Sequence, residues 1–194
     1  MKTLFVELKT SLLATLVLAV LLCGAYPVLV WGAGQLLFRD KANGSLIADA
    51  DGTVRGSARL AQNFTSEKYF HPRPSAAGTG YDAASSSGTN LGPTSQRLAD
   101  AVQAAVAAYR KENSLAADAS VPADAVTSSA SGLDPHISVA NARLQAPRVA
   151  QARHLPADRV EALIAANTDP RDLRIFGEPG VNVLLLNRAL DRAK

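Results

Sequence analysis

The chain has 194 residues and a formal net charge of +3, and 47% of its residues are hydrophobic while only 5% are aromatic. Its charges are interspersed, without a basic run or an alternation of aromatic and basic side chains, so the composition argues against nucleic-acid binding. The only cysteine, Cys23, lies inside an apolar segment. The polar remainder therefore has no disulfide, no thiolate metal site and no thiol nucleophile, which fits either side of a bacterial membrane.

The segment Ser11–Phe38 contains no charged side chain. As a helix it would be about 42 Å long, which exceeds the thickness of a bilayer's hydrocarbon core. We therefore expect a transmembrane helix at 11–38, preceded by residues 1–10 and followed by a single soluble domain at 39–194. A cleaved signal peptide ending near Cys23 is an alternative, but strong hydrophobicity continues beyond that point. A buried core helix of this length would be unusual.

The predicted membrane helix carries features that suit packing against other helices. Aromatic side chains cluster in its C-terminal half, where they favour the membrane–water interface. Pro27 should bend the helix, and glycines leave smooth places for a neighbouring helix, although such residues are also common in membrane helices generally. The residues expected to pack on a partner are Gly24, Pro27, Trp31, Gly32 and Gly34.

The flanking charges do not settle the orientation, because basic residues stand on both sides of the segment: Lys2 and Lys9 before it, Arg39, Lys41 and Arg55 after it. A short N-terminus followed at once by a hydrophobic segment favours a signal anchor with the N-terminus inside. This orientation would leave the 39–194 domain on the outer side of the membrane.

The first part of the domain is expected to contain little regular structure. Turn signals at Asn43-Gly44 and Asp51-Gly52 predict a small hairpin over 46–60. Residues 62–75 contain two prolines among aromatic and basic side chains, and we expect an extended loop that either binds a ligand or is fixed to the core by its aromatic rings. Residues 76–95 are rich in Gly, Ser and Thr, and form either a flexible insertion or an ordered loop.

The second part is expected to be helical. Apolar spacing predicts a helix after Thr94, which would be its N-cap, and a second, short helix begins near Pro122. Ser138 should cap a helix over 139–153 that contains Pro147, and a further helix should begin at 155–158. Residues 173–176 are expected to form a brief strand. Residues 181–190 begin like a strand and end like a helix, and we favour helix. The expected class is thus α+β, mainly helical.

No constellation of catalytic residues is apparent in the domain. His71, His136 and His154 show neither i, i+4 pairing nor carboxylates at ligand spacing, which argues against a metal site. Serines 128, 129 and 131 precede Asp134 and His136, but nothing there resembles a nucleophile elbow. Two hypotheses therefore remain. One is an accessory subunit that packs on partner helices, and the other is a membrane-anchored ligand-binding or hydrolytic domain; the lack of a catalytic cluster favours the first.

In order and content, the motifs resemble the C subunit of the bacterial Kdp potassium-transporting P-type ATPase, the KdpC family. The resemblance spans the chain from the membrane helix to the end. It rests on 42–47 (ANGSLI), Gly56-Ser57, 62–64 (QNF), 69–71 (YFH), 73–75 (RPS), 88–91 (GTNL), Val126-Thr127, 129–134 (SASGLD), 148–150 (RVA) with Arg153, 181–183 (VNV), and Leu186-Asn187 with 189–191 (ALD).

This resemblance implies a non-catalytic subunit of an inner-membrane pump, with a cytoplasmic N-terminus and a periplasmic domain. The partners it implies are a channel-like potassium-translocating subunit, a P-type ATPase subunit that hydrolyses ATP, and a small membrane subunit. It agrees with the absence from this sequence of the phosphorylatable Asp-Lys-Thr-Gly motif. It also implies a role in assembly and as a catalytic chaperone that raises the affinity of the ATPase subunit for ATP.

The resemblance further implies that ATP associates with the Ser/Gly-rich loop, here Ser87, Gly88, Thr89 and Asn90. The family often has Gly where Ser87 stands, which weakens a backbone cradle, and a periplasmic domain does not meet cytoplasmic ATP. A second departure is Pro72, where the family often has Gly, and it should stiffen the 62–75 loop. No tightly bound cofactor is implied.

Overall fold

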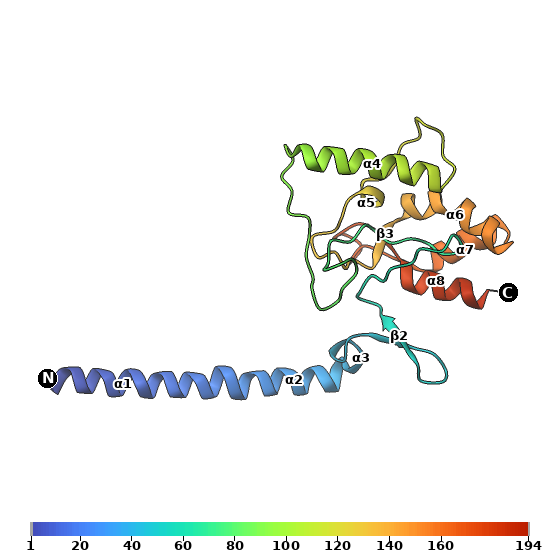
Figure 1. The fold of residues 1–194 in the computed structure, drawn as a ribbon. Coiled ribbons are helices and arrows are strands. Elements are labelled where there is room, and N and C mark those ends of the chain that lie inside the picture. The colour runs from blue at the N-terminus through green and yellow to red at the C-terminus, as the bar shows by residue number, and fades with distance from the viewer. Residues whose placement is uncertain (1, 194) are drawn as a thin grey trace. The chain divides into compact units, whose positions relative to one another are not determined.

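The computed structural model describes residues 2–193, and about half of them are helical, with short strands in two small sheets (Figure 1). The predicted class, α+β and mainly helical with an N-terminal apolar helix, is confirmed. The chain forms two compact units that meet at the Ser57–Ala58 bond. We describe each unit separately.

The first unit begins with a long apolar helical segment. It comprises α1 (Lys2–Ala19), a π-helical turn (Val20–Ala25) and α2 (Tyr26–Leu37). Residues Thr3–Leu37 are long and apolar enough to cross a membrane, with a mean hydropathy of 2.4 over an 18-residue stretch, and none of them is buried within the described chain. The segment is therefore not a core helix. It begins before the expected Ser11, and it ends before Phe38, whose φ of −137° is not helical.

Pro27 is accommodated by the π-helical turn just before it. A proline in a helix cannot donate to the carbonyl four residues back, and its ring crowds that carbonyl. Here the preceding residue, Tyr26, donates its N–H to the carbonyl of Leu21, five residues back. Widened turns of this kind relieve such crowding without ending the helix.

The unit closes with a short helix and a hairpin. Helix α3 (Arg39–Ala42) precedes β1 (Leu46–Ala48), which pairs antiparallel with β2 (Val54–Ser57). In the turn between the strands, Thr53 donates its N–H to the carboxylate of Asp51. The predicted hairpin is thus confirmed, although the strand ends before Leu60.

The second unit combines helices with one three-stranded antiparallel sheet, in the order β3–β5–β4. Figure 1 shows its helices around this small sheet. The elements are α4 (Gln96–Glu112), α5 (Ala123–Val126), β3 (His136–Ser138), α6 (Val139–Arg153), α7 (Ala157–Ala166), β4 (Thr168–Asp169), β5 (Gly180–Asn182) and α8 (Val183–Arg192).

The helices were largely predictable, but one cap was not. Helix α6 has the predicted bounds, with Pro147 inside it, and the Ser138 hydroxyl accepts from the N–H of Asn141 as an N-cap should. The prediction that Thr94 caps α4 is wrong. Ser95 holds that position, and its side chain makes no capping hydrogen bond.

Two other predictions need correction. Residues 173–176 do not form a strand: Asp172 and Phe176 exchange backbone hydrogen bonds across a tight turn, with Leu173 and Arg174 at positive φ. The short third strand is instead β4. Residues 181–190 are neither all helix nor all strand, because β5 ends at Asn182 and α8 begins at Val183.

The core of the second unit lies between α6, α7, α8 and the sheet, and it includes a side chain from the irregular segment 62–75. That side chain is Phe70, which is fully buried. The core residues are Phe70, Ile137, Ala142, Ala146, Val149, Ala150, Val160, Ile164, Val181, Val183, Leu186 and Leu190. The 62–75 segment is therefore fixed to the core by an aromatic ring, as one of its two interpretations expected.

Candidate functional site

The predicted partner-packing residues of the membrane helix lie mostly on one side of it. At about 100° per residue, Gly24, Pro27, Trp31 and Gly34 fall within an arc of about 80°, whereas Gly32 lies about 80° beyond Gly24 on the other side. A Cβ placed on Gly24 or Gly32 would meet nothing within 4 Å, and one on Gly34 would reach the Cβ of Ala42 at 3.7 Å. Gly24 and Gly32 therefore leave open places on the helix where a neighbour can approach closely.

The predicted nucleotide loop, Ser87 to Asn90, lies against the serine-rich segment 129–132. The N–H of Ser87 donates to the carbonyl of Ser131 at 3.0 Å. A Cβ on Gly88 would stand 2.8 Å from the carbonyl oxygen of Ala130, so only glycine fits that contact. Thr89 and Asn90 are exposed, and Asn90 has positive φ. The amide of Ser87 is thus already engaged within the chain, whereas the side chains of Thr89 and Asn90 face solvent.

Gly132 is the centre of this serine-rich junction. Its φ is +67°, and a Cβ there would lie 2.5 Å from the carbonyl oxygen of Ser87 and 2.7 Å from the amide of Ala77. The Ser75 hydroxyl donates to the carbonyl of Gly132 at 2.6 Å and accepts from the N–H of Tyr81 at 2.8 Å. These bonds join the consecutive segments 62–75 and 76–95 to Gly132, which is distant in the sequence, so the 76–95 loop is ordered where it meets them.

Buried polar side chains from α6 and α8 hold the 62–75 segment. The Asn187 amide accepts from the N–H of Phe70 at 2.8 Å and donates to its carbonyl at 2.9 Å. Gln145 does the same for His71, at 2.8 and 3.1 Å. Arg148 donates to the carbonyls of Glu67 and Tyr69. These side chains thus replace the backbone partners that a segment without helix or strand lacks.

Sequence reasoning assigned no structural role to these residues, although Arg148 and Asn187 lie within the motifs of the resemblance. They belong to helices, and their helical spacing from apolar neighbours placed them on the buried face: Asn141, Gln145 and Asn187 are each 2% exposed or less. The sequence did contain a sign of this role: these amide side chains occupy helix positions where the 3.6-residue periodicity predicts a buried apolar residue.

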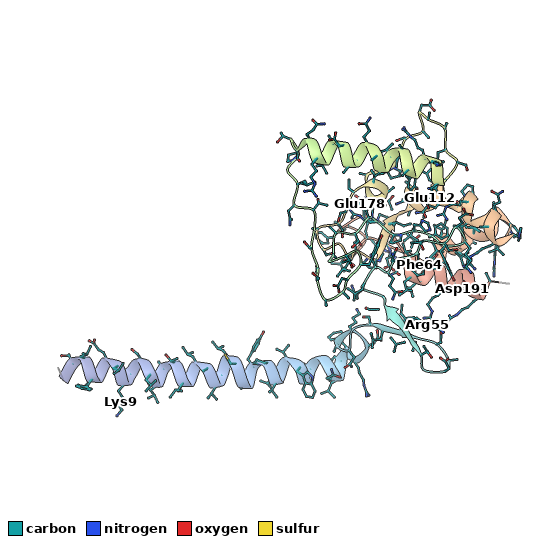
Figure 2. The ribbon with its side chains drawn as sticks, in the orientation of Figure 1. Lys9, Arg55, Phe64, Glu112, Glu178 and Asp191 are labelled. Atoms are coloured by element: carbon teal, nitrogen blue, oxygen red, sulfur yellow. The ribbon has the colours of Figure 1, made fainter. Side chains whose placement is uncertain are left out.

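The His71 side chain is part of a small polar cluster at the end of α4. Its Nδ1 contacts Glu112 at 2.5 Å and its Nε2 lies 3.1 Å from the carbonyl of Ser66. Figure 2 shows Glu112 at the C-terminal end of α4. The hydrogen bond from His71 lowers the pKa of Glu112 below its ordinary value, with the Arg148 guanidinium contributing. Burial lowers the pKa of Arg148 itself.

A cavity of about 170 Å³ lies beside this cluster, lined by His71, Pro72, Tyr109, Asn141 and Gln145 among others. Its polar lining is already bonded within the chain: Tyr109 donates to the side-chain oxygen of Asn141 at 2.8 Å, and Gln145 donates to the same oxygen at 2.9 Å. Burial raises the pKa of Tyr109. The arrangement is a structural network rather than a set of groups awaiting a ligand.

Asp134 and His136, which follow the serines in the sequence, form a group of charged side chains with Arg73 and Asp169. Asp134 contacts Arg73 at 3.0 Å, and His136 contacts Asp169 at 2.9 Å and Asp134 at 3.7 Å. Burial alone would raise the pKa of Asp134, but its bonds with His136 and Arg73 outweigh that effect and lower it. The two carboxylates, Asp134 first, raise the pKa of His136.

The serines before Asp134 make hydrogen bonds within their own segment. Ser128 donates to the carbonyl of Ser129, and the hydroxyls of Ser129 and Ser131 lie 3.4 Å apart. Within residues 2–193, no hydrogen bond joins any of these three serines to His136. No group of three or more His, Cys, Asp or Glu side chains in that range is placed to hold a metal ion.

Comparison with known proteins gives one consistent family. The family model described as "KdpC: K+-transporting ATPase, c chain" matches residues 8–192. A protein of Mycobacterium tuberculosis (strain H37Rv), named potassium-transporting ATPase KdpC subunit, is 59% identical over 186 residues, which cover 96% of this chain and 98% of the relative. Relatives of the same name from Nitratidesulfovibrio vulgaris and Caulobacter vibrioides are 55% and 54% identical, covering 94% and 95% of this chain and 92% of each relative.

Proposed function

The chain belongs to the KdpC family, the c chains of the K+-transporting ATPase, and we propose that within that ATPase it is a non-catalytic accessory subunit needed for assembly. The observation that carries this proposal is the apolar helix Thr3–Leu37, of which nothing is buried within the described chain. A helix this apolar is covered either by lipid or by other helices, and its open glycines suit close helix packing.

The second unit supports a role without catalysis. Its buried amides Asn187 and Gln145 hold the 62–75 segment, and the side chains of His71 and His136 contact carboxylates. ATP hydrolysis on this proposal takes place in another chain, the P-type ATPase subunit. The other proposed partners are the channel-like potassium-translocating subunit and a small membrane subunit.

The proposal places the protein in the bacterial inner membrane as a single-pass subunit, with residues 1–10 in the cytoplasm and the 39–194 domain in the periplasm. Support comes from the family and from the single candidate membrane helix at Thr3–Leu37 among the described residues. Protease treatment of sealed cells and of spheroplasts tests it. We expect the domain to be cleaved only after the outer membrane is opened, and cleavage only after lysis would refute this orientation.

We further propose that the subunit acts as a catalytic chaperone that raises the affinity of the ATPase subunit for ATP. For a periplasmic domain this influence must pass through the assembly rather than through contact with nucleotide. The engaged amide of Ser87 favours such an indirect route, since it is not free to bind a phosphate.

The experiment is to purify the tagged complex with and without this chain and to measure its composition, its potassium-stimulated ATPase activity and its KM for ATP. We expect loss of the chain to reduce the yield of intact complex and to raise the KM for ATP at least several-fold. Full assembly and full potassium-stimulated activity without the chain would refute the proposal. A matched Thr89→Ala/Asn90→Ala double variant of the full chain should leave the KM unchanged, and a raised KM would indicate direct nucleotide contact instead.

The second candidate function is a membrane-anchored periplasmic ligand-binding domain acting alone. The cavity beside His71 is the space it would use, although the polar groups of Tyr109 and Gln145 that line it are already bonded to Asn141. This function would be favoured if the full chain, purified in detergent, bound a small molecule while showing no affinity for the rest of the ATPase.

A further inference from the structure

A group of exposed apolar side chains lies at the end of the segment between β4 and β5. Leu173, Ile175 and Phe176 are 83%, 70% and 63% exposed. We call residues 171–176 the apolar tip. Outside the N-terminal helix and the hairpin, these are the large hydrophobic side chains of the described chain that remain most exposed. Single exposed apolar residues are ordinary, but three within four positions are a candidate for an interaction surface.

The apolar tip is held in one shape by its own backbone. Asp172 and Phe176 exchange N–H to carbonyl bonds of 2.9 Å in both directions. At its base, Arg171 pairs with Glu178 at 2.7 Å. Because the backbone groups are satisfied within the turn, the apolar side chains are presented in a fixed arrangement, which reduces the entropy lost when a partner binds them.

A groove lies at the foot of the apolar tip. It has a volume of about 410 Å³ and is lined by apolar side chains that include Val139, Ile164 and Ala165. Pro170 and Pro179, which flank the tip on either side in the sequence, also line this groove. Arg143 and Glu161, an ion pair of 3.4 Å, stand at it as well. Protein–protein interfaces commonly combine an apolar centre with charged residues at the rim. The apolar tip, the groove and the Arg143–Glu161 pair match this description better than they match a surface that inserts into lipid.

The charges of the tip indicate the chemistry of the partner. Arg171 is neutralised by Glu178, whereas no ion pair is recorded for Arg174 within the described residues. Arg174 stands between Leu173 and Ile175, so a partner that covers these apolar side chains also meets a guanidinium. A carboxylate beside an apolar pocket satisfies both requirements.

From these observations we propose that the apolar tip and its groove form a docking surface for another protein chain of the ATPase, which contributes an apolar pocket with a carboxylate at its edge. This inference rests on the proposed accessory function, because it assumes that the partner belongs to the same assembly. It assigns the domain a contact of its own, separate from the packing of the membrane helix.

The first test locates the partner directly. The full chain carries photoreactive benzoylphenylalanine in place of Ile175 and is irradiated within the complete ATPase in native membranes. We expect a covalent adduct with another protein subunit. The matched control places the same group at Ala104, which is exposed on α4, and should give at least tenfold less adduct. An adduct with lipid, an adduct with a second copy of this chain, or no adduct at 175 would overturn the proposal.

The second test measures affinity. Purified full chain is titrated into the complex that lacks it, and potassium-stimulated ATPase activity gives the half-saturating concentration. The variant Leu173→Ser/Phe176→Ser should raise that concentration at least tenfold, and Arg174→Glu should raise it by a smaller, salt-dependent factor. The matched control, Leu46→Ser/Val54→Ser, removes two apolar side chains of the hairpin that are 56% and 55% exposed and should leave it unchanged.

The two proposals fail in different ways. If the complex without the chain were already fully active, the accessory function would be refuted while the photochemical test of the docking surface would still stand. If addition of the chain restored activity but the tip variants titrated like the wild type, the docking surface alone would be refuted.

Discussion

Two irregular segments of the second unit contain phenylalanine, and Phe70 of one is buried whereas Phe176 of the other is exposed. In the 62–75 segment, Phe70 is fully buried and its backbone N–H and carbonyl are bonded to the side chain of Asn187. In the apolar tip, Phe176 is 63% exposed and its backbone is bonded within the turn to Asp172. One segment is part of the core, and the other projects from the fold.

The difference shows what a segment without helix or strand needs in order to be buried. Its backbone polar groups must find partners, and apart from the bond of the Tyr69 N–H to the carbonyl of Ser66, side chains of α6 and α8 supply them to residues 67–71. Further contacts fix its edge: Phe64 stacks against Tyr69 at 5.3 Å between ring centroids, and Tyr69 donates to Asp191 at 3.1 Å. Figure 2 labels Phe64 and Asp191 on this side of the unit.

The largest expected effect comes from truncating the buried ring. Phe70→Ala should lower the free energy of unfolding by about 3–5 kcal/mol, because it removes a core side chain and leaves a cavity. Phe176→Ala is the matched control and should change it by less than about 0.5 kcal/mol. Urea unfolding of the full chain in detergent, followed by circular dichroism, measures both. Equal effects of the two substitutions would contradict the comparison.

The next effect concerns the backbone partner of Phe70. Asn187→Ala should cost about 2–3 kcal/mol, since it leaves a buried N–H and a buried carbonyl without partners. Asn167→Ala removes only the bond of its side chain to the carbonyl of Leu163 at the end of α7 and should cost about 1 kcal/mol or less. A smaller loss of unfolding free energy in Asn187→Ala than in Asn167→Ala would show that the Asn187 side chain does not hold the 62–75 segment.

Two glycines at positive φ give an intermediate effect. Gly132→Ala introduces both backbone strain and a clash with the carbonyl of Ser87, and should cost about 2–3 kcal/mol. Gly177, next to the apolar tip, has φ of +78° and open space around it, so Gly177→Ala should cost only the strain, about 1 kcal/mol. The same unfolding measurement compares them, and equal losses would mean that the serine-rich junction relaxes around the added methyl group.

The smallest effect is a pH dependence. The pKa of His136 is raised in the folded chain, so its contribution to stability is fully present below its ordinary value of 6.5 and is lost as the pH rises through the raised pKa. Because His136 and Asp169 are partly exposed, this contribution should be below about 1 kcal/mol.

The lowered pKa of Asp134 works in the opposite direction, with its contribution lost as the pH falls through that pKa. His136→Asn should therefore flatten the decline in melting temperature above pH 6.5. His154→Asn, at a position of positive φ that asparagine tolerates, is the control and should leave the decline as it is. If the melting temperature of His136→Asn still declined above pH 6.5 as in the wild type, the decline would be due to a group other than His136.

Much of the fold was predictable from local patterns. Ser138 and the spacing of apolar residues after it gave the bounds of α6, and Asp51-Gly52 gave the hairpin turn, because caps and turns depend on residues close in sequence. The strand expected at 173–176 failed for a different reason. Its apolar and β-branched residues suit a strand, but strand formation needs a neighbouring strand, and within residues 2–193 the segment belongs to neither sheet.

The candidate site was predictable only in part. The glycines of the membrane helix and the Ser87–Asn90 loop were recognised from the sequence, and their roles stay predictions. Asn187, Gln145 and the docking surface at the apolar tip were not recognised, because each depends on which residues far apart in the chain meet or fail to meet.

By itself, the sequence determined the apolar helix, the family and most of the helices, since these follow from composition and from the order of residues along the chain. Only the tertiary structure decided that Phe70 is core while Leu173, Ile175 and Phe176 are surface. The physical reason is that burial of an irregular segment depends on partners for its backbone. Asn187, 117 positions away along the chain, supplies both partners to Phe70, whereas in the tip the backbones of Asp172 and Phe176 bond to each other within the turn.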